Sequence, residues 1–206
     1  MPKSKKPRKP HEPKRIAIPI FYKYEEAKVR RRFENAEIAV NIKLPRGECS
    51  KDDVNTIFDC LNVGNFISQH RRAEIDPEQY REMLMALNAA WPALESLYSR
   101  GEAHGGRYVC TAEELKKIPL AMAYVTDVVK LFLETQPGAV VDEYNGALLL
   151  RDVLPGDDAF KVDDEAISCA YLLAREAAFH QRDFEAEIER AKARLRKKLK
   201  GRIERV

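Results

Sequence analysis

The strongest constraint on the fold is a helix-start signal that recurs along the chain. In this signal a side chain accepts hydrogen bonds from the first free amides of a helix, and a second polar residue follows three positions later. It occurs at Ser50 with Asp53, at Asp76 with Gln79 and at Thr111 with Glu114. Apolar residues spaced by three and four positions follow each signal. Helices are therefore predicted over residues 51–69, 77–98 and 111–135.

The segment 25–44 fits two patterns. Apolar residues from Ile38 to Leu44 alternate with other residues as in a strand, whereas Phe33, Ala36 and Val40 follow the spacing of a helix. We favour a helix, because the charged residues that precede them are strong helix formers. A strand remains the alternative.

One segment carries the signal of a β-hairpin. Asn145-Gly146 is the favoured two-residue turn between antiparallel strands, and apolar residues flank it on both sides. A small hairpin is predicted, with strands over 139–144 and 147–153.

The last part of the chain predicts one long helix. Asp163 is a suitable N-cap, and apolar residues recur at helical spacing as far as Leu199. At 1.5 Å per residue, a helix over 164–200 reaches about 55 Å, more than the roughly 34 Å of a compact body of this size. Its basic half is therefore expected to project. The fold class is mainly α, a bundle of about five helices with one small β-hairpin and a long basic C-terminal helix.

Charge is distributed very unevenly along the 206 residues. Seven cations and one carboxylate give residues 1–15 a charge of +6, and nine cations and one carboxylate give 190–205 a charge of +8. With a total of +3, residues 16–189 carry −11. Four prolines and like charges oppose folding at the start of the chain. We expect a disordered basic arm (1–15), a helical globular domain (16–189) and a basic helical extension (190–206).

The two basic ends predict an anionic partner, and nucleic acid is the commonest one. The acidic body is the competing, internal partner. No base-reading helix-turn-helix is evident, so weak sequence specificity is expected. The body would hold the two ends in place or carry a homodimer contact. The candidate nucleic-acid-binding residues are Lys3, Lys5, Lys6, Arg8, Lys9, Lys14, Arg15, Arg190, Arg194, Lys197, Lys198, Lys200 and Arg202.

Several classes of function lack their motifs. The sequence has no phosphate-binding P-loop, serine-hydrolase elbow, zinc-protease helix or dinucleotide-binding glycine pattern, so no enzyme and no cofactor are expected. The four cysteines are far apart, which predicts reduced thiols and neither a metal site nor a disulfide framework. No apolar run of signal-peptide or spanning length occurs, so a cytoplasmic protein without membrane association is expected. His70-Arg71-Arg72 has donors for an anion, although such short clusters are mostly solvated loops.

Three features together resemble a protein group. They are the Lys/Arg/Pro-rich start, the stretch Asp59-Cys60-Leu61-Asn62-Val63, and Gly105-Gly106-Arg107-Tyr108 before Thr111-Ala112-Glu113-Glu114-Leu115. Over about residues 1–135 the chain resembles small uncharacterised proteins encoded by proteobacterial prophages and plasmids. The resemblance implies a mobile-element origin and transfers no activity. Two functions are therefore carried forward: a non-enzymatic accessory protein that associates with nucleic acid, or a protein-interaction module that acts on a host protein through its acidic body.

Overall fold

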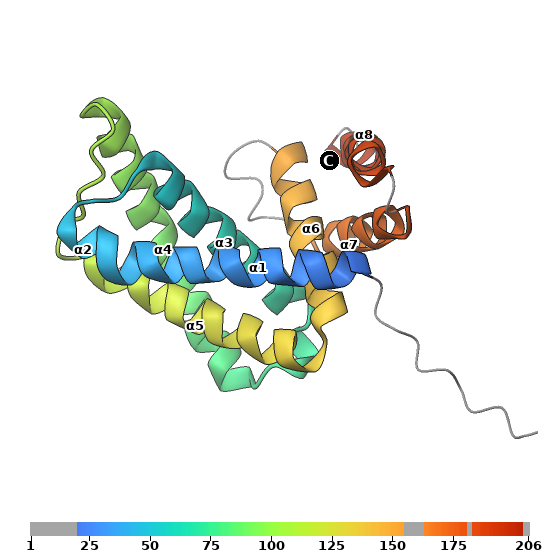
Figure 1. Cartoon of the computed structure of the whole chain (residues 1–206), viewed down its shortest axis with the longest axis horizontal. Helices are drawn as coiled ribbons and strands as arrows, with labels where there is room; N and C mark the ends of the chain where they lie inside the picture. The colour runs from blue at the N-terminus through green and yellow to red at the C-terminus, as the bar shows by residue number, and fades with distance from the viewer. Residues whose placement is uncertain (1–19, 155–162, 181–182, 204–206) are drawn as a thin grey trace, which may run out of the picture.

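The computed structural model describes residues 20–154, 163–180 and 183–203, and these form a mainly helical bundle (Figure 1). The described residues contain no strand, only an isolated bridge between Cys49 and Tyr108. The elements in chain order are α1 (Ile20–Ile38), a π-helical turn (Ala39–Lys43), α2 (Leu44–Arg46), α3 (Lys51–His70), a 3-10 turn (Arg72–Glu74), α4 (Pro77–Ala103), α5 (Glu114–Thr135), α6 (Pro137–Val153), α7 (Asp164–Phe179) and α8 (Phe184–Ile203).

The predicted helix starts are present. At α3 the Ser50 hydroxyl accepts from the Asp53 amide, and the Asp53 carboxylate accepts from the Ser50 amide. Thr111 and Glu114 exchange the same pair of bonds before α5, which begins three residues later than predicted. Asp76 caps α4 by accepting from two amides of its first turn. The ambiguous segment 25–44 is helical, through α1, the π-helical turn and the start of α2.

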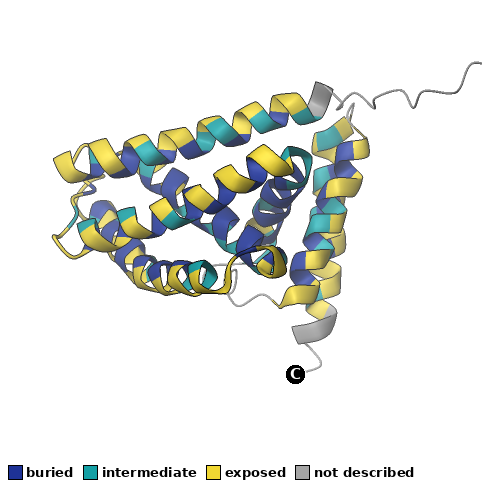
Figure 2. Cartoon of the chain, turned by 90° about the horizontal axis from the view of Figure 1, so that it is seen from below, coloured by how far each residue is buried: buried dark blue, intermediate teal, exposed yellow. Residues whose placement is uncertain are grey.

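α6 lies at the centre of the bundle. It contacts α1, α3, α5, α7 and α8, and every residue from Val140 to Ala147 is buried. Burial colouring in Figure 2 shows the outer helices with exposed outer faces and buried inner faces. The hydrophobic core is built around this helix and extends between α3, α4 and α5.

The prediction of a β-hairpin over residues 139–153 is wrong, because these residues form α6. Asn145-Gly146 lies inside the helix. A Cβ atom at Gly146 would lie 3.1 Å from Phe66 Cζ and 3.3 Å from the backbone of Tyr171, so the glycine permits the close approach of α7 rather than a turn. A helix buried on all sides has no polar face, and its sequence lacks the period that identifies an amphipathic helix.

The prediction of one long helix over residues 164–200 is also wrong. α7 ends at Phe179 and α8 begins at Phe184, and α8 packs back against α7 and α6. Leu195, in the half that was expected to project, has an exposed fraction of 0%. The described residues therefore contain seven helices longer than one turn, compared with the five expected. Residue 190, the expected start of the basic extension, lies within α8, and the basic arm 1–15 lies outside the described residues.

Candidate nucleic-acid interface

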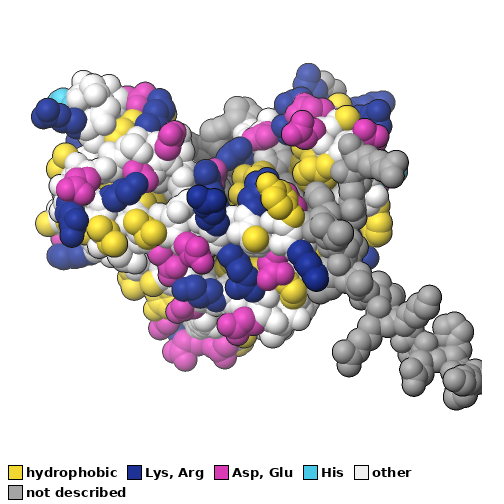
Figure 3. Space-filling model, viewed as in Figure 1, with side chains coloured by type: hydrophobic (Ala, Val, Ile, Leu, Met, Phe, Trp, Pro, Cys, Tyr) yellow, Lys and Arg dark blue, Asp and Glu magenta, His cyan; other side chains and the backbone are white. Residues whose placement is uncertain are grey.

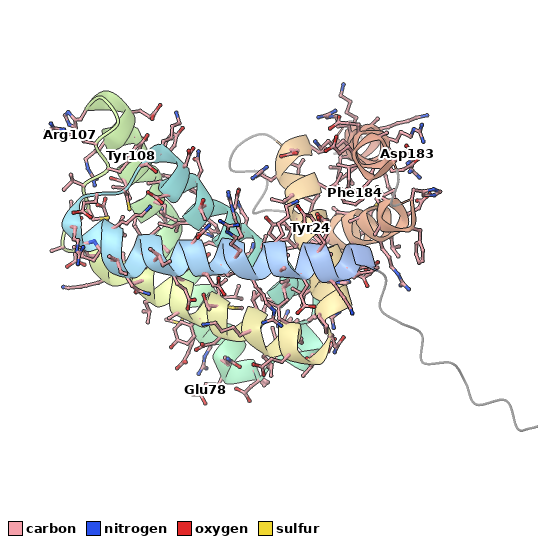
Figure 4. All side chains as sticks on the ribbon, in the orientation of Figure 1. Tyr24, Glu78, Arg107, Tyr108, Asp183 and Phe184 are labelled. Carbon is pink, nitrogen blue, oxygen red and sulfur yellow. The ribbon has the colours of Figure 1, made fainter. Side chains whose placement is uncertain are left out.

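The candidate site that the structure describes lies on α8. Asp183 and Phe184 mark its start in Figure 4, at the end of the molecule opposite Arg107 and Tyr108. The other candidate cations lie outside the described residues: Lys3, Lys5, Lys6, Arg8, Lys9, Lys14 and Arg15. Arg202 belongs to α8, but its side chain is not described. Arg190, Arg194, Lys197, Lys198 and Lys200 are exposed on the helix.

Carboxylates neutralise the first half of the basic segment. Each of its three cations contacts at least one carboxylate of α6, α7 or α8 itself, and Lys192 Nζ lies 3.0 Å from Asp152 and 2.7 Å from Glu189. The pairs are Arg190 with Glu187, Lys192 with Asp152 and Glu189, and Arg194 with Glu176 and Glu187. Lys192 and Arg194 thus contact carboxylates of α6 and α7, whereas Arg190 pairs within α8 itself.

The second half differs. Arg196, Lys197, Lys198 and Lys200, here called the open cation cluster, are all exposed, and none of them forms an ion pair with a described residue. Arg196 donates to the carbonyl oxygen of Asp152 at 3.3 Å, a bond that leaves its charge uncompensated. Cations near the C-terminal end of a helix also interact favourably with its dipole. The cluster concentrates positive charge within about one and a half turns of helix.

α8 holds this cluster at the edge of the molecule. In Figure 2 the helix runs down one side of the bundle from the level of α1, so its basic half lies farthest from α1. Ala191 and Leu195 are fully buried against the body. Figure 3 shows Lys and Arg side chains around α8, with Asp and Glu interspersed among them. The anchoring face and the cationic face are therefore separate sides of one helix.

A chain of charged side chains connects α8 to the centre of the fold. Asp59 on α3 accepts from Arg32 on α1 at 2.7 Å and also contacts Arg151 on α6. Arg151 contacts Asp152 at 2.9 Å, and Asp152 in turn contacts Lys192 on α8. Burial opposes the ionisation of Asp152, but hydrogen bonds from Lys192 and Arg151 outweigh it and hold its pKa below the usual range. These pairs help to fix the orientation of α8.

A second polar cluster, around α6, was missed at the level of sequence. The fully buried Glu143 carboxylate accepts from Arg71 Nε at 2.5 Å and contacts His70 Nδ1 at 2.8 Å. Arg71 also donates to Gln136 at 2.7 Å. The sequence indicated that residues 70–72 have donors for an anion. In the structure this anion is a carboxylate of the same chain, that of Glu143. It was missed because Glu143 was assigned to a hairpin, where it has no reason to meet α3.

Asp142, the neighbour of Glu143, binds the first turns of α1. Tyr22 Oη donates to its carboxylate at 3.1 Å, and Asp142 has an exposed fraction of 4%. Burial raises the pKa of Asp142 to about 6, although the bond from Tyr22 acts in the opposite direction. Burial and the neighbouring carboxylate together raise the pKa of Tyr22 to about 12. α6 thus uses adjacent carboxylates to hold α3 and α1.

Comparisons with known proteins do not assign the chain to a family. The sequence matches no family profile, and neither a curated protein nor a solved structure shows significant similarity to it. Among the described residues, no group of three or more His, Cys, Asp or Glu side chains is arranged to hold a metal ion. No helix in the same part of the chain is long and apolar enough to cross a membrane. Cys49, Cys60, Cys110 and Cys169 are free thiols in the structure.

Proposed function

We propose that the protein is a non-enzymatic, cytoplasmic accessory protein of a mobile genetic element that associates with nucleic acid through its basic terminal segments. The observation that carries the proposal is the open cation cluster of α8. Its four exposed cations form no ion pair with a described residue, whereas the three cations before them all do. A polyanion has the chemistry to neutralise this charge.

The mechanism is phosphate contact by flexible cationic side chains. Lysine and arginine bind phosphate oxygens without reading base edges, so weak sequence preference follows. Ala191 and Leu195 hold α8 on the body, and the side chains of the cluster lie outside this buried stripe. The basic residues 3–15 would add contacts in the same way. Binding of this kind releases counterions and weakens steeply as salt rises from about 50 to about 200 mM.

The test removes the cluster without changing the anchoring face. In a variant with Arg196, Lys197, Lys198 and Lys200 changed to Gln, we expect DNA affinity at about 50 mM salt to fall at least about tenfold. The slope of log K against log salt should decrease by up to about 3 to 4, since each phosphate contact contributes about 0.9. Fluorescence anisotropy with a mixed-sequence duplex measures both quantities.

A matched control removes the same charge elsewhere. Arg31, Arg46, Arg107 and Lys117 are exposed cations on other parts of the chain, and changing all four to Gln lowers the net charge equally. We expect this control to bind much more tightly than the α8 variant. Equal losses would show that binding follows net charge alone and would reject a site on α8. Failure of the unaltered protein to bind DNA at low salt would reject the proposal entirely.

An alternative proposal is a protein-interaction module that acts on a host protein through the helical body. The observation that favours it is a surface depression along α4 that is lined by Tyr80, Leu84 and Met85 together with polar residues that include Arg72 and Arg81. Met85 has an exposed fraction of 67%. An exposed apolar surface with a charged rim is typical of a protein interface.

The two proposals differ in their response to salt. A complex formed through α4 should persist at about 200 mM salt and should be lost in Met85→Glu, because its contact is apolar. Changing the open cation cluster to Gln should leave such a complex intact. The reverse pattern in a pull-down supports nucleic-acid association instead.

A further inference from the structure

The surface depression along α4 combines apolar and cationic side chains. It has a volume of about 550 Å³, and from Pro77 to Asn88 it follows about three turns of the helix, or about 16 Å. Glu78, in the first turn of α4, lies at the lower edge of the molecule in Figure 4, well away from Phe184 at the start of α8. We call this depression the α4 groove, and the side chains that give it its character are Arg72, Tyr80, Arg81, Leu84 and Met85.

Two arginine side chains line the α4 groove, and neither has a strong partner within the described chain. Arg72 is exposed and forms no ion pair with a described residue, and its guanidinium carbon lies 5.1 Å from the centroid of the Tyr80 ring. Arg81 pairs with Glu78 at 3.6 Å, but the two side chains are 69% and 74% exposed. Water screens such a pair, so it contributes little. Both guanidinium groups are therefore available to a carboxylate from outside.

The carboxylates nearest to these arginines in the sequence have other partners. Glu74 accepts from Arg71 and Gln136, and Glu82 accepts from Tyr124 on α5. Neither of these glutamates lines the α4 groove. The groove therefore offers positive charge to one or two carboxylates. The negative charge around it opposes the approach of a long polyphosphate chain.

The apolar part of the α4 groove is open to solvent. Met85 is 67% exposed, and Tyr80 and Leu84 are half-buried. Such exposure suits a segment of another protein better than a small molecule, because small-molecule sites enclose most of the ligand surface. Tyr, Met and Arg side chains are also enriched at protein interfaces. A length of about 16 Å accommodates about five residues of extended peptide.

We propose that the α4 groove binds an acidic peptide segment of a partner protein, in which carboxylates flank one bulky apolar side chain. The apolar side chain packs on Leu84 and Met85, and the carboxylates pair with Arg72 and Arg81. The contact with Tyr80 holds Arg72 in place, so less side-chain entropy is lost on binding. This inference rests on the alternative function above, the protein-interaction module, and names the chemistry of its partner.

Selection of a random peptide library, displayed on phage, on the full-length protein tests this chemistry. We expect the selected sequences to carry Asp or Glu on both sides of a Phe, Trp, Leu or Ile. A synthetic peptide of the commonest sequence then gives the affinity by fluorescence anisotropy at low salt. Arg72→Glu combined with Arg81→Glu should weaken its binding at least about tenfold, because like charges then face each other. The same peptide with Lys in place of its acidic residues should bind this double variant more tightly than the unaltered protein.

Matched variants separate the α4 groove from the rest of the surface. Arg46→Glu combined with Arg107→Glu reverses the same charge at exposed positions elsewhere and should change the affinity by less than about threefold. Met85→Ser should weaken binding clearly, whereas Leu131→Ser, at a 47% exposed apolar position on α5, should not. The melting temperature of each variant confirms that it is folded.

Three results would overturn the inference. They are selected peptides without carboxylates, an acidic peptide that binds the double variant as tightly as the unaltered protein, and loss of DNA binding in that variant. If a host-protein complex is lost in Met85→Glu but survives the reversal of both arginines, the interaction module stands and the acidic partner is wrong. If neither a selected peptide nor a host protein depends on the α4 groove, both are rejected.

Discussion

α6 and α8 are helices of similar length that occupy opposite environments. Every residue of α6 from Val140 to Ala147 is buried, including the carboxylates of Asp142 and Glu143. α8 buries a narrow apolar stripe and exposes most of its charged residues. The central helix thus carries two of its carboxylates inside the fold, whereas the peripheral helix carries most of its charges in solvent.

This difference determines what each charge contributes to stability. A carboxylate in the interior must be satisfied by specific partners, because removing one of them leaves an uncompensated charge in a medium of low polarity. Exposed pairs gain little, since water and salt screen them. The charge of Glu143, which Arg71 and His70 contact, is therefore expected to hold the fold together, while the charges of the second half of α8 are available for a partner. Four predictions test this contrast.

The largest effect is expected at Glu143. Glu143→Ala removes the carboxylate that Arg71 and His70 share, and should lower the free energy of unfolding by about 3 to 5 kcal/mol. Glu189→Ala on α8 is the matched control, because this carboxylate is 66% exposed, and its cost should stay below about 1 kcal/mol. Urea denaturation at neutral pH measures both. Similar losses in the two variants would remove the contrast between the helices.

Leu195 shows where α8 does belong to the core. Leu195→Ala should cost about 2 to 4 kcal/mol, because the side chain is fully buried. Leu199→Ala, one turn later and only partly buried, should cost clearly less. Deleting residues 190–206 should therefore lower the melting temperature, which a projecting helix would not do. Equal, small losses in the two variants would instead indicate that α8 is loosely attached.

The pH dependence of Asp142 sharpens the description of α6. Burial raises its pKa from the ordinary 3.8 to about 6, so the folded protein holds this proton more tightly than the unfolded chain does. Protonated Asp142 makes its full contribution to the free energy of unfolding below about pH 4. This contribution, about 2 to 3 kcal/mol, is lost as the pH rises through about 6. As the pH rises from about 4 to about 6, the free energy of unfolding of Asp142→Asn should increase by the same amount relative to that of the unaltered protein. A stability difference that is independent of pH would contradict this assignment.

The smallest effect is expected at Arg190. Its side chain is 67% exposed and pairs with Glu187 within the same helix. Arg190→Ala should change the free energy of unfolding by less than about 0.5 kcal/mol, and added salt should reduce even that difference. A loss as large as that from Glu143→Ala would contradict the small contribution expected of an exposed pair within one helix.

The sequence predicted those elements whose signals are local. Ser50, Asp76 and Thr111 cap helices through bonds to amides two or three positions away, and such contacts can be recognised from neighbouring residues alone. The pairing of Arg190 with Glu187, three positions apart, is local as well. The mainly helical fold class therefore followed from short-range patterns.

Features that depend on distant parts of the chain were not predictable in this way. Asn145-Gly146 favours a turn in isolation, and only the packing of Phe66 and Tyr171 against Gly146 gives this glycine a place inside a helix. The partner of Arg194 is Glu176, across the turn between α7 and α8, where one continuous helix was expected. The open cation cluster consists of the cations of α8 that form no ion pair with a described residue. Its members can therefore be identified only once the fold is known.

The central position of α6 also has a consequence for biosynthesis. A ribosome makes α1, α3, α4 and α5 before α6, yet α6 covers the inner surfaces of α1, α3 and α5. A nascent chain that ends before Pro137 therefore has an unfilled apolar slot, and such surfaces attract chaperones or other nascent chains. Translation of the last third of the chain therefore covers this apolar surface and lowers the tendency of the nascent chain to aggregate.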